Sequence, residues 1–140
     1  MLKKAVIVSL LWCLMLPLSA HSQTLLKGYS DGENFRVELV AEGFSVPWGM
    51  VFLEDGKLLI TERRGRLTLL HLSDNKTTAI EGVPEVFSEG QGGLLDIALP
   101  PDFIESGWVY FTYSKPVKNR GATTLARAKL GDDTLINWQD

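Results

Sequence analysis

Apolar and polar residues alternate along much of the chain in short segments with a period of two. Residues 35–40 alternate in this way, which is typical of a strand with one buried face. Short apolar runs at 48–53 and 94–99 are each followed by a turn-forming sequence and then by a further strand pattern. Apolar residues do not recur at a helical spacing of three and four, so we expect no long helix. The pattern therefore predicts an all-β protein.

Turn residues separate the expected strands. Residues 54–56 (Glu-Asp-Gly) and 62–65 (Glu-Arg-Arg-Gly) are short enough to join the strands of hairpins. The segments 100–107 and 114–122 are more polar and are expected as longer loops, and 23–34 is expected as an N-terminal linker. Strands are predicted at 35–40, 48–53, 57–61, 66–72, 94–99, 108–113 and 123–130.

The second half of the chain repeats the pattern of the first. Residues 50–53 match 97–100 at an offset of 47, and 66–68 match 124–126 at an offset of 58 because the second unit has longer turns. A repeat of about 40 to 50 residues with several short strands is typical of propeller blades. Two blades cannot close a ring, so we expect 35–140 to be the N-terminal part of a larger propeller. A complete small β-sandwich is the alternative that the pattern leaves open.

Residues 1–22 have the order of regions found in a secretory signal peptide. Lys3 and Lys4 form a basic start, an apolar run follows, and small residues at Ala20 and Ser22 suit a cleavage site. The apolar run of about 14 residues is shorter than the roughly 20 that a spanning helix needs. We therefore expect a bacterial periplasmic or secreted protein without a membrane span after cleavage.

Cleavage would change both the charge and the cysteine content. Lys3 and Lys4 are lost with the signal peptide, so 12 basic residues remain against 17 acidic ones and the formal net charge becomes −5. The chain's one cysteine, Cys13, is lost as well, so the exported protein would be stabilised by its core without disulfides. An acidic chain with no basic stripe in its sequence argues against nucleic acid as a partner.

A glycine-rich loop is the strongest candidate for a binding site. Residues 89–93 (Glu-Gly-Gln-Gly-Gly) lead directly into the apolar run 94–99. Glycines permit tight turns and close approach of a ligand, and the amide of Gln91 both donates and accepts hydrogen bonds. We expect Gln91 to bind substrate or cofactor at the mouth of a strand. The alternative is a turn in which Gln91 only caps backbone groups.

An ordered set of motifs resembles one protein family. The motifs are PWGMVFL (47–53), LITER (59–63), GVPEV (82–86), GQGGLLD (90–96), PDF (101–103), VYFTYS (109–114) and LARA (125–128). Together they resemble the soluble PQQ-dependent sugar dehydrogenases of the glucose/sorbosone dehydrogenase family, and most closely its aldose sugar dehydrogenase branch. The resemblance covers nearly all of 35–138. It implies a six-bladed β-propeller, of which this chain would supply about the first two blades.

The resemblance also implies a reaction and its cofactors. The family oxidises an aldose sugar at C1 to the lactone, with pyrroloquinoline quinone (PQQ) and Ca²⁺ as cofactors and an external electron acceptor. Gln91 resembles the family glutamine that faces the sugar and the quinone. The family's base, its quinone-binding arginines and its calcium ligands lie beyond residue 140. We therefore expect no catalytic residue and no metal ligand in this chain.

Weaker candidates lie near the same end of the expected blades. Arg63 and Arg64 can contact an anionic quinone carboxylate, although a solvated hairpin turn is the alternative. Trp48 can contact a sugar face, with core packing as the alternative. Asp96 is expected to accept hydrogen bonds from backbone donors at a blade end, and His71 to lie on the rim.

Two other functions remain open on the sequence alone. One is a non-catalytic exported β-propeller or β module that binds carbohydrate or protein, since one fold serves many functions. The other is a propeller hydrolase of the lactonase type.

Overall fold

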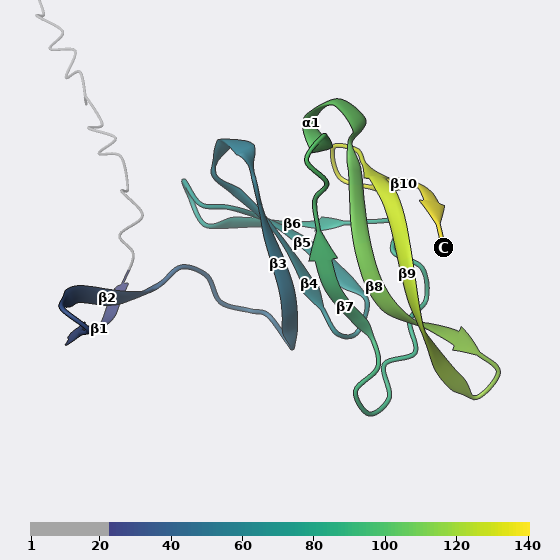
Figure 1. Ribbon diagram of the computed structural model, residues 1–140, viewed down its shortest axis with the longest axis horizontal. Helices are drawn as coiled ribbons and strands as arrows, with labels where there is room; N and C mark the ends of the chain where they lie inside the picture. Colours follow the sequence, from purple (N-terminus) through teal and green to yellow (C-terminus); the bar gives the residue numbers. More distant parts are fainter. Residues whose placement is uncertain (1–22) are drawn as a thin grey trace, which may run out of the picture.

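The computed structural model describes residues 23–140, and the predicted signal peptide at 1–22 lies outside the described residues. This part of the chain forms ten strands and two single-turn helices, as the sequence pattern predicts for an all-β protein. Eight of the strands form two four-stranded antiparallel sheets, and the other two form a separate hairpin (Figure 1).

Each large sheet is a meander in which neighbouring strands in the sequence are also neighbours in space. The first has the order β3-β4-β5-β6 and the second the order β10-β9-β8-β7. The first comprises β3 (Pro47–Leu53), β4 (Lys57–Glu62), β5 (Arg66–His71) and β6 (Lys76–Ile80), with the 3-10 turn η1 (Glu54–Gly56) after β3. The second comprises β7 (Leu94–Ala98), β8 (Trp108–Val117), β9 (Arg120–Leu130) and β10 (Leu135–Gln139), with α1 (Phe103–Ser106) before β8. We call these sheets blade one and blade two.

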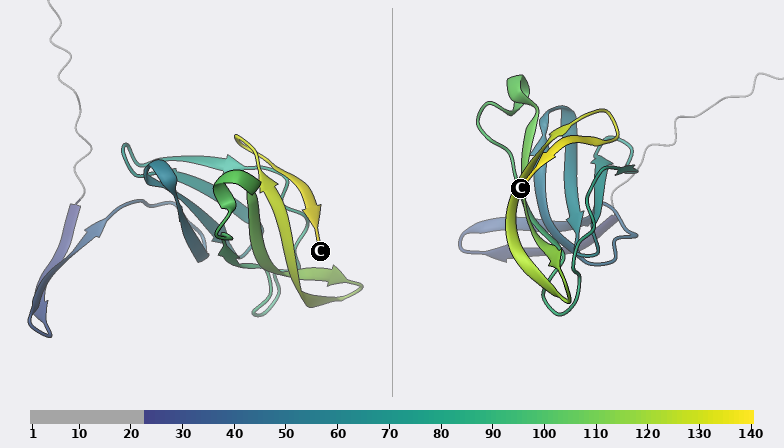
Figure 2. Two further views of the ribbon diagram at one scale, coloured as in Figure 1. Left: turned by 45° about the horizontal axis from the view of Figure 1, so that its top comes forward. Right: turned by 90° about the vertical axis from the view of Figure 1, so that its right-hand side faces the viewer.

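The two blades pack face to face, with their first strands β3 and β7 side by side (Figures 1 and 2). Apolar side chains from both sheets form one core between them, including Leu59 and Leu67 of blade one and Ile97 and Phe111 of blade two. Trp138 of β10 extends this core because its ring stacks on Phe111 at a centroid distance of 5.3 Å. Burial of these large side chains holds the twisted sheets together.

The internal repeat extends to a detail of the backbone. The pairing register shifts within β3 between Pro47 and Met50, and within β7 between Leu94 and Ile97. In blade one the freed amide of Gly49 donates to the hydroxyl of Thr61 at 3.0 Å. In blade two the amide of Asp96 donates to the hydroxyl of Thr112, also at 3.0 Å. In both blades, the backbone amide at the irregularity thus finds its hydrogen-bond acceptor in a threonine on the second strand.

The segment 114–122 differs from the predicted loop. Strands β8 and β9 continue through it as a hairpin in which Val117 pairs with Arg120 across a two-residue turn. Lys118 in that turn has φ 53°. The hairpin extends beyond the core, so polar side chains such as Lys115 are exposed there without ending the strand. Polarity in this segment indicates exposure to solvent and not a loop.

The N-terminal segment also differs from its prediction. Residues 23–34, expected as a linker, form β1 (Gln23–Ser30) and the start of β2 (Glu33–Leu39), which pair as a hairpin. Asp31 and Gly32 in the turn have φ 51° and 88°, as a tight Asp-Gly hairpin turn requires. The predicted buried face of 35–40 is not found, because Phe35 and Val37 are each 43% exposed. The hairpin stands away from both blades (Figure 1).

Strands β6 and β10 were not among the predicted strands. Both are the fourth strand of their blade, and β6 is mostly exposed and rich in lysine and threonine. The polar sequence of β6 has no alternating apolar pattern to mark it, and β10 is a short strand with an irregular register. The two strands lie close to each other, because the amide of Glu81 donates to the carbonyl of Asp133 at 2.9 Å and the amide of Leu135 donates to the carbonyl of Glu81 at 2.8 Å.

Candidate functional site

The starts of β3 and β7 lie at one end of the two blades, together with the β4–β5 turn. The carbonyl of Arg63, in that turn, accepts a hydrogen bond from the amide of Leu94 at the start of β7 (2.9 Å). The amide of Arg63 donates to the carbonyl of Val46, just before β3 (2.9 Å). The turn of blade one therefore joins the first strands of both blades at this end.

The glycine-rich loop that precedes β7 is anchored on both sides. The amide of Phe87 donates to the carbonyl of Ser114 (2.8 Å), and the amide of Ser114 donates to the carbonyl of Gly93 (2.8 Å). Within the loop, the amide of Gly92 donates to the carbonyl of Glu89 (2.9 Å) and closes a tight turn. Gln91 lies in this turn with its side chain exposed. The structure thus places the Gln91 amide on a fixed turn at the end where β7 begins.

Positions 92 and 93 need glycine, because backbone atoms of other residues lie too close for a side chain. A side chain at Gly92 would overlap the carbonyl oxygen of Phe87, and one at Gly93 would overlap the carbonyl oxygen of Arg63. Gly93 also has φ +144°, a conformation that residues with a side chain rarely adopt. These glycines therefore allow the loop to lie directly against blade one.

The two candidate arginines have different surroundings. The Nη1 atom of Arg63 donates a hydrogen bond to the carbonyl of Gly90, next to Gln91. Arg64 is exposed and lines a shallow groove with Arg66 and residues 79–83. The structure therefore brings Arg63 together with the Gln91 loop but does not bring Arg64 there.

Trp48 is not packed in the core between the blades. Its side chain is 47% exposed and alternates on β3 with Val51 and Leu53, which do pack against that core. Met50 and Phe52 share the exposed side of β3, where they line an apolar groove with Leu58. Trp48 is therefore not part of the core between the two blades, and its predicted contact with a sugar stays a prediction beside the core-packing alternative.

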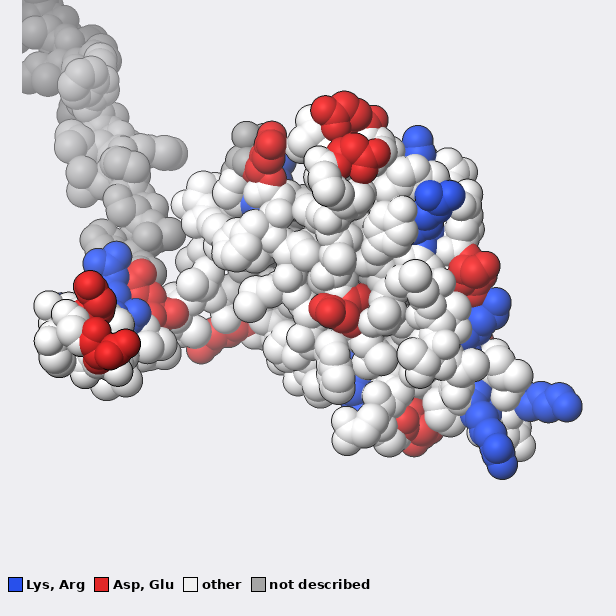
Figure 3. Space-filling model, viewed as in Figure 1, with Lys and Arg blue, Asp and Glu red and all other residues white. Residues whose placement is uncertain are grey.

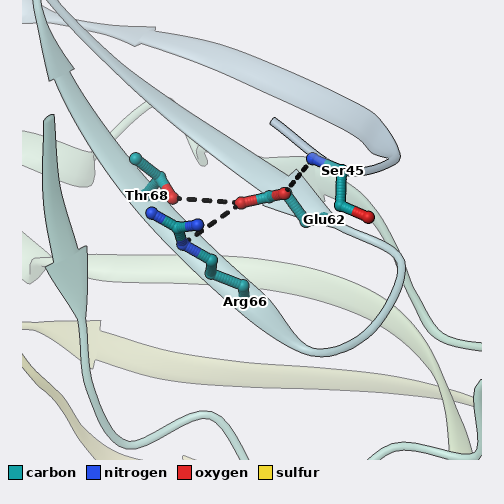
Figure 4. A network of polar contacts seen from close by, with 4 residues as sticks. All are labelled: Ser45, Glu62, Arg66 and Thr68. Carbon is teal, nitrogen blue, oxygen red and sulfur yellow. Dashed lines mark hydrogen bonds and ion pairs between the residues drawn. The ribbon is translucent and has the colours of Figure 1, made fainter. Parts of the chain in front are cut away.

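A buried carboxylate holds the chain before β3 against the β4–β5 turn (Figure 4). Glu62 is 1% exposed and accepts a hydrogen bond from the amide of Ser45 at 2.6 Å. Its other carboxylate oxygen lies 3.2 Å from Nε of Arg66 and 3.5 Å from the hydroxyl of Thr68. A buried carboxylate needs such partners to offset its lost hydration. Glu62 is thus a buried structural residue and not part of a solvated turn.

Thr61, next to Glu62, connects the first strands of the two blades. Its hydroxyl accepts from the amide of Gly49 and donates to the carbonyl of Leu95 on β7 at 2.5 Å. Sequence reasoning missed both Thr61 and Glu62 as supports of the site. The available signal was a polar pair directly after the apolar run at 58–60.

Asp96 and His71 lie as expected. The Asp96 carboxylate accepts a hydrogen bond from the amide of Ile97 at 2.9 Å, within the irregular part of β7. His71 is partly buried in the last position of β5, and in the sheet it pairs with Lys57 and Lys76. Residues 57 and 76 begin their strands at the opposite end of blade one from the Gln91 loop. Neither Asp96 nor His71 is therefore placed at the tip of that loop.

Basic side chains gather along β8 and β9 (Figure 3), which the linear sequence did not indicate. Three of them have partners within the chain. The guanidinium of Arg127 lies 4.4 Å from the centre of the Trp108 ring and the ammonium of Lys129 lies 5.3 Å from it. Lys115 pairs with Asp140 at 2.6 Å. These three cationic groups therefore already make cation–π contacts or an ion pair within the chain.

Tyr113 forms a buried polar contact at the edge of blade two. It is 2% exposed, and its hydroxyl donates to the carboxylate of Asp140 at 2.7 Å. Burial, followed by the hydrogen bond to Asp140 and the negative charge of that carboxylate, raises the pKa of Tyr113 to about 12. The Lys115 ammonium, and after it the Tyr113 hydroxyl, holds the pKa of Asp140 below its usual value.

The raised pKa of Tyr113 predicts a loss of stability at alkaline pH. The folded protein keeps the phenol proton up to about pH 12, whereas the unfolded chain loses it near pH 10. The contribution to stability is therefore complete below about pH 10 and is lost as the pH rises towards 12. Melting temperatures across this range should fall less steeply for Tyr113→Phe than for the parent protein. Tyr29→Phe, at a position that is 69% exposed, should behave like the parent; equal slopes for all three proteins would contradict the assignment.

Two further properties concern the part of the chain that the structure describes. Within residues 23–140, no three His, Cys, Asp or Glu side chains lie close enough together to hold a metal ion. No helix in the same range has the length and apolarity needed to cross a membrane.

Comparison with known proteins identifies the family. The family model for Glucose / Sorbosone dehydrogenase matches residues 44–140. A protein of Synechocystis sp. is 43% identical over 108 residues, which cover 71% of this chain and 26% of that protein. Aldose sugar dehydrogenase YliI of Escherichia coli is 35% identical over 99 residues, which cover 69% of this chain and 27% of that enzyme. The PQQ-bound aldose sugar dehydrogenase of Streptomyces coelicolor superimposes with a TM-score of 0.66 at 25% identity, covering 85% of this chain and 33% of that structure.

The chain spans about a quarter to a third of the length of these relatives. The likeness confirms the predicted all-β propeller fold, of which this chain supplies two blades, and rules out the alternative of a complete β-sandwich. The match covers both blades and the Gln91 loop between them. The chain therefore belongs to the glucose/sorbosone dehydrogenase family.

Proposed function

We propose that this chain is part of an exported enzyme that oxidises aldose sugars at C1 to lactones with PQQ as cofactor. The observation that supports this most directly is the exposed Gln91 amide on a tightly anchored glycine loop, within a chain of the sugar dehydrogenase family. One structural relative is described as the PQQ-bound form of an aldose sugar dehydrogenase. Gln91 would form one wall of the sugar–quinone site.

Oxidation at C1 requires an acceptor for the hydroxyl proton, an acceptor for two electrons, and polar groups that orient the sugar. PQQ, when bound, supplies the electron acceptor. Gln91 suits the third role because its amide donates and accepts hydrogen bonds at once. The proton acceptor is expected elsewhere in the family domain, so this chain orients the reactants and does not itself move the proton.

The groups around the loop fit an anionic quinone with carbonyl and carboxylate oxygens. The Gln91 amide can donate to such oxygens, and the positive charge of Arg63 lies beside the same loop. The Gln91 donor and the nearby positive charge therefore suit an anionic ligand rich in acceptors.

The remaining parts of the proposal rest on the family and on the sequence. Ca²⁺ would be held by oxygen ligands outside residues 23–140, because this hard cation takes 6–8 oxygen ligands. Electrons would pass to an external acceptor. The signal-peptide pattern of residues 1–22 supports export to the bacterial periplasm or the medium.

The test uses the full-length gene product purified without cofactor. With PQQ and Ca²⁺ added, we expect saturable PQQ binding in a spectroscopic titration and aldose-dependent reduction of an electron-acceptor dye, with the lactone as product. Omission of PQQ should abolish dye reduction. Sugar binding without any turnover in the presence of PQQ would overturn the proposal in favour of a non-catalytic carbohydrate-binding propeller, and hydrolysis of added lactones would favour a hydrolase.

A further inference from the structure

We propose that Arg63 is a positioning residue, which acts on the sugar–quinone site by holding the Gly90–Gln91 turn and not by contacting a ligand. The inference rests on the proposed function of Gln91. Arg63 and Gly90 are 27 residues apart in the sequence and belong to different structural units, the β4–β5 turn of blade one and the loop before blade two.

The backbone of Arg63 is fixed on both sides. Its amide donates to the carbonyl of Val46 and its carbonyl accepts from the amide of Leu94, each at 2.9 Å. Preceding Arg63, Glu62 is buried and bonded to the amide of Ser45 at 2.6 Å. The side chain of Arg63 thus projects from a rigid base, which a positioning residue requires.

The glycine loop is shaped to receive this arginine. A Cβ atom at Gly93 would lie 2.6 Å from Cγ of Arg63 and 2.9 Å from its carbonyl carbon, distances that real Cβ atoms do not tolerate. With glycine at this position, the stem of Arg63 passes directly over the backbone of the loop. Its guanidinium then reaches the carbonyl of Gly90 on the far side.

The tip of the loop depends on this contact. Gly90 has φ +56°, and no atom lies within 4 Å of where its side chain would be, so side-chain packing does not hold it. The hydrogen bond from Arg63 fixes the Gly90 carbonyl and therefore the peptide that leads to Gln91. A hydrogen bond from a charged donor is among the stronger ones. Loss of this donor should free the turn while leaving the blades intact.

The first measurement needs no enzymatic activity. In Arg63→Met, deuterium exchange of the Gly92 backbone amide, which closes the turn by donating to the carbonyl of Glu89, should rise by about tenfold, because one charge-assisted hydrogen bond restrains the turn. Arg63→Lys, which keeps a charged donor, should restore part of the protection. Arg64→Met, at the exposed neighbouring position, is the matched control and should leave exchange unchanged. Unchanged exchange in Arg63→Met would overturn the positioning role.

The second measurement separates positioning from direct ligand contact by a double-mutant cycle in the full-length enzyme. If Arg63 acts through Gln91, the loss of kcat/KM in Arg63→Met combined with Gln91→Ala should equal that of Gln91→Ala alone. If Arg63 contacts the quinone or the sugar, the two losses should multiply, and the proposal fails. Altered exchange in a protein that never oxidises sugars would refute the proposed function but leave the positioning of the turn intact.

Discussion

Gly93→Ala is expected to lower the free energy of unfolding by about 3–5 kcal/mol, from backbone strain at a positive φ together with steric overlap. The new methyl group would overlap the carbonyl oxygen of Arg63, which now accepts from the amide of Leu94. Relief of the overlap would separate the loop from the turn of blade one. Chemical denaturation of the full-length protein measures the loss.

Gly56→Ala provides the matched control for this prediction. Gly56 also has a positive φ, +67°, but nothing lies within 4 Å of the added methyl group. Its substitution should cost only the conformational strain of about 1–2 kcal/mol. The difference between the two variants therefore measures the steric contact between the blades. Equal losses for Gly93→Ala and Gly56→Ala would show that the loop does not rest on Arg63.

Gln91→Ala is expected to reduce kcat/KM for aldose oxidation by about 10- to 100-fold, since a hydrogen bond to a charged or strongly polar ligand is worth about 1.5–3 kcal/mol. The side chain is exposed, so the thermal stability without cofactor should not change. Gln91→Glu should be at least as impaired, because a carboxylate cannot donate and would repel an anionic quinone. Steady-state kinetics with PQQ and Ca²⁺ added provides the measurement.

The control for Gln91 comes from the same loop. Glu89 is also exposed, and its carbonyl, which is the group that closes the turn with Gly92, is retained in Glu89→Ala. This variant should keep kcat/KM within about twofold of the parent, as surface substitutions usually do. Full activity in Gln91→Ala would leave only the capping role for this side chain.

Local sequence signals predicted the parts of the fold that depend on near neighbours. The apolar runs at 48–53 and 94–99 became β3 and β7, and the turn residues at 54–56 became η1. The offset of 47 residues between the repeats also relates Gly49 to Asp96, whose amides are satisfied in the same way in each blade. Such patterns are readable because strand periodicity and turn chemistry act over a few residues.

Features that depend on distant parts of the chain were not predicted. The outer strand β6 and the end of the β8–β9 hairpin carry no apolar alternation, because much of their surface faces solvent. Strand β10 is short and its register is irregular. The burial of Glu62 depends on Ser45 and Thr68, which complete its hydrogen bonds from other segments. In the sequence, Glu62 beside Arg63 and Arg64 looks like part of an exposed turn, because its hydrogen-bond partners come from other segments.

The sequence by itself determined the all-β class, the repeat and the family, and it predicted a binding site at the Gln91 loop. It did so because strand alternation, glycine-containing turns and ordered motifs are properties of short segments. Only the tertiary structure decided that Arg63 and not Arg64 reaches the loop, since their neighbouring positions look equivalent in the sequence. The packing of blade two against the turn of blade one places the carbonyl of Gly90 within reach of the Arg63 guanidinium.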